Sequence, residues 1–120
     1  MKGIIWYGHD NRDNAVIQIN RIKRAYAYSI WDKEKHFGWN LHKTDEENIN
    51  EVIEKELTSF SEHYVKFING DEWRIVPASE NMRGHSCNIS YIDRTIPQDI
   101  VEVIIKPCTK ASPYQAYNYW

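Results

Sequence analysis

The sequence predicts one small α+β (mixed α/β) domain over residues 1–120, in which a sheet containing an antiparallel hairpin packs against two or three helices. Three observations support this prediction. The chain has 120 residues, which is enough for one hydrophobic core. Residues 63–76 read as two strands joined by an Asn-Gly pair, the pattern of a β-hairpin. Two other segments, 14–28 and 44–60, repeat apolar residues at helical spacing.

The composition argues against several classes of protein. Fifteen Lys and Arg against 17 Asp and Glu give a formal net charge of −2, so no overall positive field would hold a nucleic-acid duplex. A mean hydropathy of −0.68 argues against a membrane span, and the N-terminus lacks the apolar stretch of a signal peptide. The two cysteines, Cys87 and Cys108, suit reduced thiols, so we expect a soluble protein of the cytoplasm.

The first expected elements are a strand and a helix. Residues 3–7 form a short apolar run, typical of a buried strand, and residues 8–11 form a turn cluster. Asp13 or Asn14 can cap the next helix, because a short side-chain oxygen accepts a hydrogen bond from the first turn. The helix over 14–28 turns Arg21 and Arg24 toward solvent, and its inward stripe is Val16, Ile19, Ile22, Lys23 and Tyr26.

The middle of the chain predicts a second helix and the hairpin. Residues 31–40 read as a strand or an ordered loop. Thr44 and Glu47 have the spacing of a capping box, and an apolar helical stripe follows at Ile49, Val52, Ile53, Leu57 and Phe60.

In the hairpin, strands 63–68 and 71–76 flank Asn69-Gly70. This pair tolerates the two positive φ angles of a two-residue type I′ turn. Pro77 then ends the second strand.

The last third predicts a polar loop over 78–86, a strand over 88–92 and a short helix that begins near Thr95 and Pro97. The helix carries Ile100, Val103 and Ile104, and Pro107 and Pro113 then interrupt the tail. The tail is rich in aromatic residues, so we expect it to dock on its own core or on a second copy of the chain: Tyr114, Tyr117, Tyr119 and Trp120.

The sequence predicts no metal site, no cofactor and no catalytic set. The five histidines show no pairing four residues apart on a helix, and the two cysteines lack zinc-ligand spacing. No nucleophile motif surrounds Cys87, which we interpret as a small core residue. The acidic pairs are explained by the hairpin turn and by helix capping.

The candidate phosphate-binding segment is Arg83-Gly84-His85. No Gly-x-x-x-x-Gly-Lys loop is present, so the chain cannot build a P-loop. Gly84 allows backbone N–H groups to approach a ligand, and Arg83 supplies a planar fork for phosphate. The alternative is a solvated loop with ordinary surface arginines. Further candidates are Trp73, Arg74 and Asn88 for stacking or polar contacts, with Arg24 and Lys110 as weaker cationic positions.

Two resemblances extend this interpretation. Residues 67–93 contain a hairpin, a loop that reaches Arg83-Gly84 and an apolar strand that ends in Asp93. This order resembles the central stretch of phage large-terminase ATPases, in which the strand ends in Asp-Glu. In this chain Arg94 replaces the Glu and the phosphate loop is missing, so a complete terminase motor is not expected.

The whole chain is similar to small phage and prophage proteins of Gram-positive bacteria, through MKGIIWY at 1–7, NGDEW at 69–73 and RGHSCNISYID at 83–93. Among them it resembles the anti-Thoeris nucleotide-sponge family. The resemblance implies a homodimer or larger homo-oligomer with pockets between protomers. It also implies that the protein sequesters a cyclic ADP-ribose-type signal, or cyclic oligonucleotides, without cleaving it.

Together these observations predict a non-enzymatic phage protein that captures a cyclic nucleotide-type immune signal in the host cytoplasm and so blocks an anti-phage defence. A sponge needs cationic forks and aromatic faces but no attacking group. The alternative is a terminase-derived interaction module that binds a phage or host protein through the aromatic tail. A small nuclease or hydrolase using Asp93 and His85 around a metal ranks last.

Overall fold

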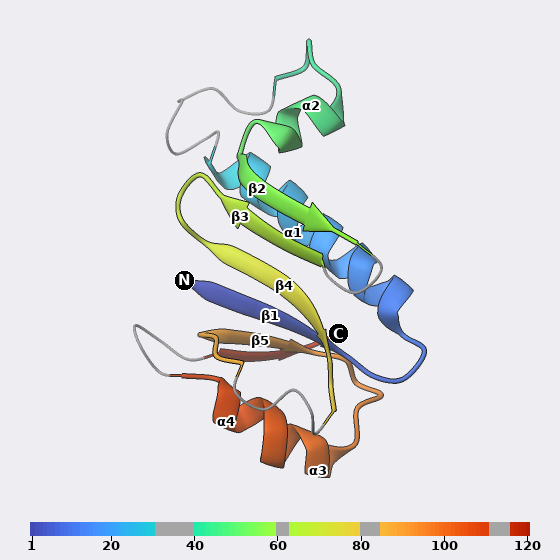
Figure 1. The fold of residues 1–120 in the computed structure, drawn as a ribbon. Helices are drawn as coiled ribbons and strands as arrows, with labels where there is room; N and C mark the ends of the chain where they lie inside the picture. Colours follow the sequence, from blue (N-terminus) through green and yellow to red (C-terminus); the bar gives the residue numbers. More distant parts are fainter. Residues whose placement is uncertain (31–39, 60–62, 80–84, 111–115) are drawn as a thin grey trace.

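A mixed sheet of six strands, ordered β2-β3-β4-β1-β5-β6, forms the centre of the computed structural model (Figure 1). The structure describes residues 1–30, 40–59, 63–79, 85–110 and 116–120. Three helical regions accompany the sheet within these residues. The predicted α+β domain, with a hairpin-containing sheet and helices against it, is confirmed. None of the helices in the described ranges is long and apolar enough to cross a membrane.

Strand β1 (Lys2–Tyr7) occupies the middle of the sheet, as its apolar sequence predicts. It lies parallel to β4 (Glu72–Pro77) on one side and to β5 (Ile89–Ile92) on the other. Strand β6 (Ala116–Tyr119) continues the parallel part beside β5. A strand flanked on both sides and both faces has no exposed edge, which explains the continuous apolar run.

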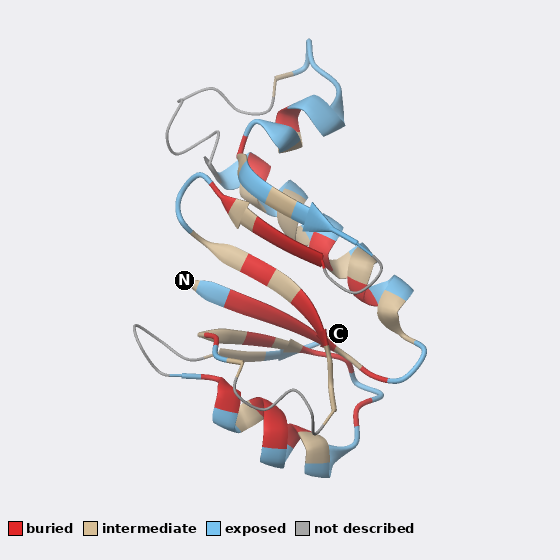
Figure 2. Ribbon diagram, viewed as in Figure 1, coloured by how far each residue is buried: buried red, intermediate tan, exposed pale blue. Residues whose placement is uncertain are grey.

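Helices cover both faces of the sheet (Figures 1 and 2). Alternate residues of β1 point to opposite faces. Ile5 lies in one core cluster with Ile19 of α1 (Arg12–Ile30). Ile4 and Trp6 lie in the other cluster, beside a continuous C-terminal helical segment made of α3 (Gln98–Ile100), a π-helical turn η3 (Val101–Ile105) and α4 (Lys106–Cys108).

The hairpin of β3 (His63–Phe67) and β4 is confirmed, but its turn differs from the prediction. The backbone bonds Phe67 N to Asp71 O and Gly70 N to Phe67 O, at 2.8 and 2.9 Å, which leaves three residues in the connection. Gly70 has a φ of +94°, whereas Asn69 does not have a positive φ. The predicted two-residue type I′ turn is therefore wrong: one left-handed glycine after an ordinary turn closes the hairpin.

The second predicted helix is correct at its start and wrong at its end. Helix α2 (Asp45–Asn50) begins with the expected capping box of Thr44 and Glu47. The chain then forms strand β2 (Ile53–Thr58), which pairs with β3, where the apolar stripe predicted more helix. The free edge of β3 offers hydrogen bonds to this segment, and such tertiary pairing overrides a short helical pattern.

Two predictions about helix ends are also corrected. Helix α1 begins at Arg12, so Asp13 and Asn14 lie inside its first turn and neither caps it. Pro107 lies within α4 and does not end the helix. The wider π-helical turn just before it, with Lys106 N bonded to Val101 O, accommodates a residue that has no N–H to donate.

The described end of the tail packs on its own chain. Strand β6 pairs with β5, Tyr117 contacts one core cluster and Trp120 contacts the other. The predictions for residues 31–39, Phe60, Arg83-Gly84, Pro113 and Tyr114 lie outside the described residues.

Candidate functional site

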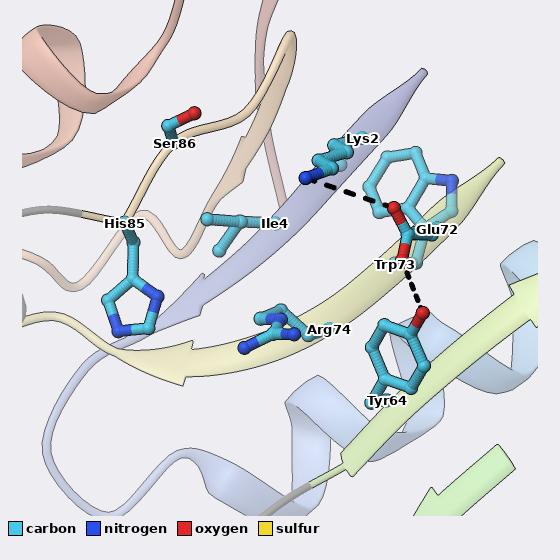
Figure 3. Close-up of a pocket in the computed structure, with 9 residues that line it drawn as sticks. Lys2, Ile4, Tyr64, Glu72, Trp73, Arg74, His85 and Ser86 are labelled. Atoms are coloured by element: carbon cyan, nitrogen blue, oxygen red, sulfur yellow. Dashed lines mark hydrogen bonds and ion pairs between the residues drawn. The ribbon is translucent and has the colours of Figure 1, made fainter.

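A hollow of about 310 Å³ lies on the sheet face opposite α1, over β3, β4 and β1 (Figure 3). We call it the Arg74 groove. Its labelled lining residues are Lys2, Ile4, Tyr64, Glu72, Trp73, Arg74, His85 and Ser86.

The register of three strands builds the floor of the groove. Arg74 on β4 is the partner of Tyr64 on β3 and of Ile4 on β1. Because directly paired residues share one face of a sheet, these three side chains form a row across the strands. His85 and Ser86 approach the row from the segment that leads into β5.

The charges in the groove leave one cation without a carboxylate. Glu72 accepts a hydrogen bond from the Tyr64 hydroxyl and lies 4.0 Å from Lys2 Nζ. Burial and the neighbouring Glu72 raise the pKa of Tyr64 to about 12, so its hydroxyl stays protonated. Arg74 contacts the Tyr64 ring at 5.2 Å, and no ion pair joins it to any carboxylate in the described part of the chain.

Of the predicted site residues, Trp73, Arg74 and His85 line this groove. Lys110 lines a second hollow of about 240 Å³ that shares His85 and Ser86 with the first. Asn88 contacts the start of β1, where its Oδ1 accepts a 2.9 Å hydrogen bond from Lys2 N.

Trp73 lines the groove but also belongs to the core under α1, whereas Arg24 is not among the groove residues. Trp73 belongs to the core cluster under α1, where its Nε1 donates a 3.1 Å hydrogen bond to the Tyr26 hydroxyl. Arg24 lies on α1, 3.3 Å from Asp45. Arg24 is therefore not brought beside the Arg74 guanidinium.

Sequence reasoning did not single out Lys2, Tyr64, Glu72 or Ser86. Two of these residues could have been found from the register of the predicted hairpin. Pairing β3 with β4 sets Tyr64 opposite Arg74 and Lys66 opposite Glu72. Lys2 is placed at the groove by the parallel pairing of β1 with β4. These strands are separated by about half of the chain, so no local pattern indicates the pairing.

The carboxyl end of the parallel strands is closed by Asp93. Open α/β sheets commonly bind phosphates at that end. Here Asp93 is 2% exposed and its carboxylate accepts hydrogen bonds from Gly8 N at 2.8 Å, Asn11 Nδ2 at 2.6 Å and both Thr95 N and Oγ1 at 2.9 Å. Burial raises the pKa of Asp93, but these donors together outweigh it and lower the pKa.

Asp93 consequently acts as an internal anion that joins the β1–α1 turn to the end of β5. His85 precedes the opposite end of β5, so one strand separates the two residues that a metal-dependent hydrolase would need together. Among the described residues no group of three His, Cys, Asp or Glu side chains is placed to hold a metal ion.

Comparisons of the chain with protein-family models, with curated proteins and with solved structures find no match.

Proposed function

We propose that this protein is a non-enzymatic binding protein that captures a phosphate-bearing small molecule in the Arg74 groove. The observation that carries the proposal is the Arg74 guanidinium, which faces a hollow without a carboxylate partner among the described residues. A planar guanidinium matches the oxygens of a phosphate, and such charge-assisted hydrogen bonds are the strong ones.

The surroundings of Arg74 favour an anionic ligand. The Tyr64 ring supports the guanidinium from one side, which restricts its orientation before a ligand arrives. Lys2 offsets the charge of Glu72, so the carboxylate does not act on the ligand alone. His85 and Ser86 add polar groups at the rim.

The remaining chemistry supports binding without turnover. Asp93 is saturated by four donors, and burial raises the pKa of the Cys87 thiol, which lowers its reactivity. The resemblance to the nucleotide-sponge family adds a candidate ligand, a cyclic ADP-ribose isomer or a cyclic oligonucleotide. It also adds a setting, a homo-oligomer in the cytoplasm of an infected host that withholds the signal from a defence system.

The test is a depletion-and-release assay. The protein is mixed with cyclic ADP-ribose isomers, cyclic oligonucleotides and AMP, the free fraction is measured, and heat-denatured protein is examined for released ligand. We expect depletion followed by release of the intact molecule. Release of a chemically altered molecule would show that the protein is an enzyme. If no probe is depleted, the proposal is contradicted.

A pair of matched variants tests whether the ligand binds in the Arg74 groove. Arg74→Gln removes the charge at the site, and Lys55→Gln removes an exposed charge from the edge strand β2. If the proposal holds, the first variant loses more than tenfold in affinity, from about 1.5–3 kcal/mol for a charge-assisted bond, and the second binds like the wild type. Equal affinities would place the site elsewhere.

A further inference from the structure

A second hollow borders the Arg74 groove. This hollow, which we call the Lys110 pocket, has a volume of about 240 Å³, and its walls include Val103, Pro107 and Lys110. His85 and Ser86 line both hollows, so this short segment forms a ridge between them. The strand bridge between Cys87 and Thr109 holds the ridge and Lys110 in fixed positions, with Lys110 N bonded to Cys87 O at 2.7 Å.

The two hollows carry complementary features. Each contains a cation, Arg74 or Lys110, that forms no ion pair in the described part of the chain. The Lys110 pocket also presents apolar surface, since Val103 is 52% exposed beside the exposed ring of Pro107. An exposed valine in a hollow offers a face on which a flat ring can lie.

The ridge is open to hydrogen bonding. Neither His85 nor Ser86 is among the residues that form a hydrogen bond or an ion pair within the described ranges, and Ser86 is exposed. Backbone and side-chain donors on the ridge are therefore accessible to a ligand that crosses it.

We infer that the two hollows form one bipartite site for a ligand of dinucleotide size. In it, one phosphate lies against Arg74, a second lies near Lys110, and a base covers Val103. This inference rests on the proposed function and adds the second half of the site to it. Two separated cations on either side of a ridge favour a ligand with two separated negative groups over one with a single phosphate.

The experiment compares three probes by calorimetry: cyclic di-AMP, with two phosphates and two bases, AMP, with one of each, and inorganic pyrophosphate, with no base. We expect cyclic di-AMP to bind at least tenfold more tightly than either of the others. Lys110→Gln and Val103→Glu should each weaken cyclic di-AMP at least fivefold and leave pyrophosphate unchanged. Arg74→Gln should weaken both, and Lys55→Gln should change neither.

The other outcomes overturn either the bipartite site alone or the proposed function as well. Cyclic di-AMP affinity that falls in Arg74→Gln but not in Lys110→Gln or Val103→Glu overturns the bipartite site and leaves the proposed function standing. Equal affinity for cyclic di-AMP and AMP also overturns it. If no probe binds the wild-type protein, the proposed function itself fails. Val103 and Lys110 are exposed, so their variants are expected to fold, which circular dichroism checks.

Discussion

The guanidinium carbon of Arg74 lies 5.2 Å from the centre of the Tyr64 ring, on two paired strands. The Tyr64 hydroxyl is in turn bonded to Glu72. The ring contact restricts where the guanidinium lies in the groove. Tyr64 is therefore a positioning residue for the candidate site.

Substitutions of Tyr64 should distinguish the contribution of its ring to ligand binding from that of its hydroxyl. Tyr64→Leu removes the cation–π contact, worth about 0.5–1 kcal/mol, and should weaken the anionic ligand about two- to fivefold. Tyr64→Phe retains the ring and should bind within twofold of the wild type. Calorimetry with both variants checks this, and equal losses in the two would show that the ring does not position Arg74.

Asp93→Asn should be strongly destabilising. The variant keeps the shape of the side chain but turns an amide toward four donors, at a cost on the order of 3 kcal/mol. Urea denaturation at pH 7 measures the loss. Asp99→Asn, at an exposed position of α3, should stay within about 0.5 kcal/mol of the wild type.

The same carboxylate should contribute to acid sensitivity. The folded pKa of Asp93 is lowered, so its contribution to stability is present above its unfolded pKa of about 3.9 and is lost as the pH falls through the folded value. The difference in unfolding free energy between the wild type and Asp93→Asn should therefore shrink at pH 3. A constant difference from pH 7 to pH 3 would contradict this assignment.

Gly3→Ala should destabilise the sheet because the indole of Trp73 lies against that glycine. A Cβ at position 3 would stand 2.5 Å from Trp73 Cδ2, and overpacking of this kind costs about 3 kcal/mol. Trp73→Leu should rescue part of the loss, so the double variant is less destabilised than the two single changes predict together. Strict additivity in urea denaturation would show that Trp73 is not the obstacle.

His63 should make the protein less stable in mild acid. Its side chain is 6% exposed, and its Nε2 has no hydrogen-bond partner among the described residues. The charged groups around it are Lys23, Glu56 and Arg12. Burial and then Lys23 lower the pKa of His63. The folded pKa lies below the unfolded value of about 6.5, so the contribution of neutral His63 is present above pH 6.5 and is lost as the pH falls through the folded pKa.

A His63→Phe variant tests the assignment. Phenylalanine fills the site without a titrating group, so its urea midpoint should fall less between pH 7.5 and pH 5 than that of the wild type. His9→Phe, at a side chain that is 95% exposed, should leave the wild-type pH dependence unchanged. Parallel curves for His63→Phe and the wild type would mean that other groups cause the acid sensitivity.

Local patterns predicted the elements that depend on local physics. The capping box of Thr44 and Glu47, the apolar strand β1 and the hairpin all follow from a few neighbouring residues. Residues 53–58 were wrongly predicted as helix, because their apolar spacing fits either one face of a helix or an edge strand. Pairing with β3 determines which of the two forms. The parallel neighbours of β1 likewise lie about 70 and 85 residues away, beyond any local signal.

The candidate site was predictable in part for the same reason. Arg74 and His85 stood out by residue type, and the structure brings them to one groove. Trp73 stood out equally and also lines the groove, although alternation along β4 places it in the core cluster beneath α1. Lys2 and Tyr64 join the groove through strand pairing, so their place in it requires the sheet order.

The most direct test of the central claim is a nuclear magnetic resonance titration of the wild-type protein with cyclic di-AMP, with cyclic ADP-ribose as a second probe. We expect saturable shifts at Lys2, Ile4, Arg74, His85 and Ser86, with the side-chain signal of the Arg74 guanidinium among the largest. Shifts confined to the groove between α1 and α2, where Arg21 and Arg24 lie, or no saturable shift with either probe, would contradict it.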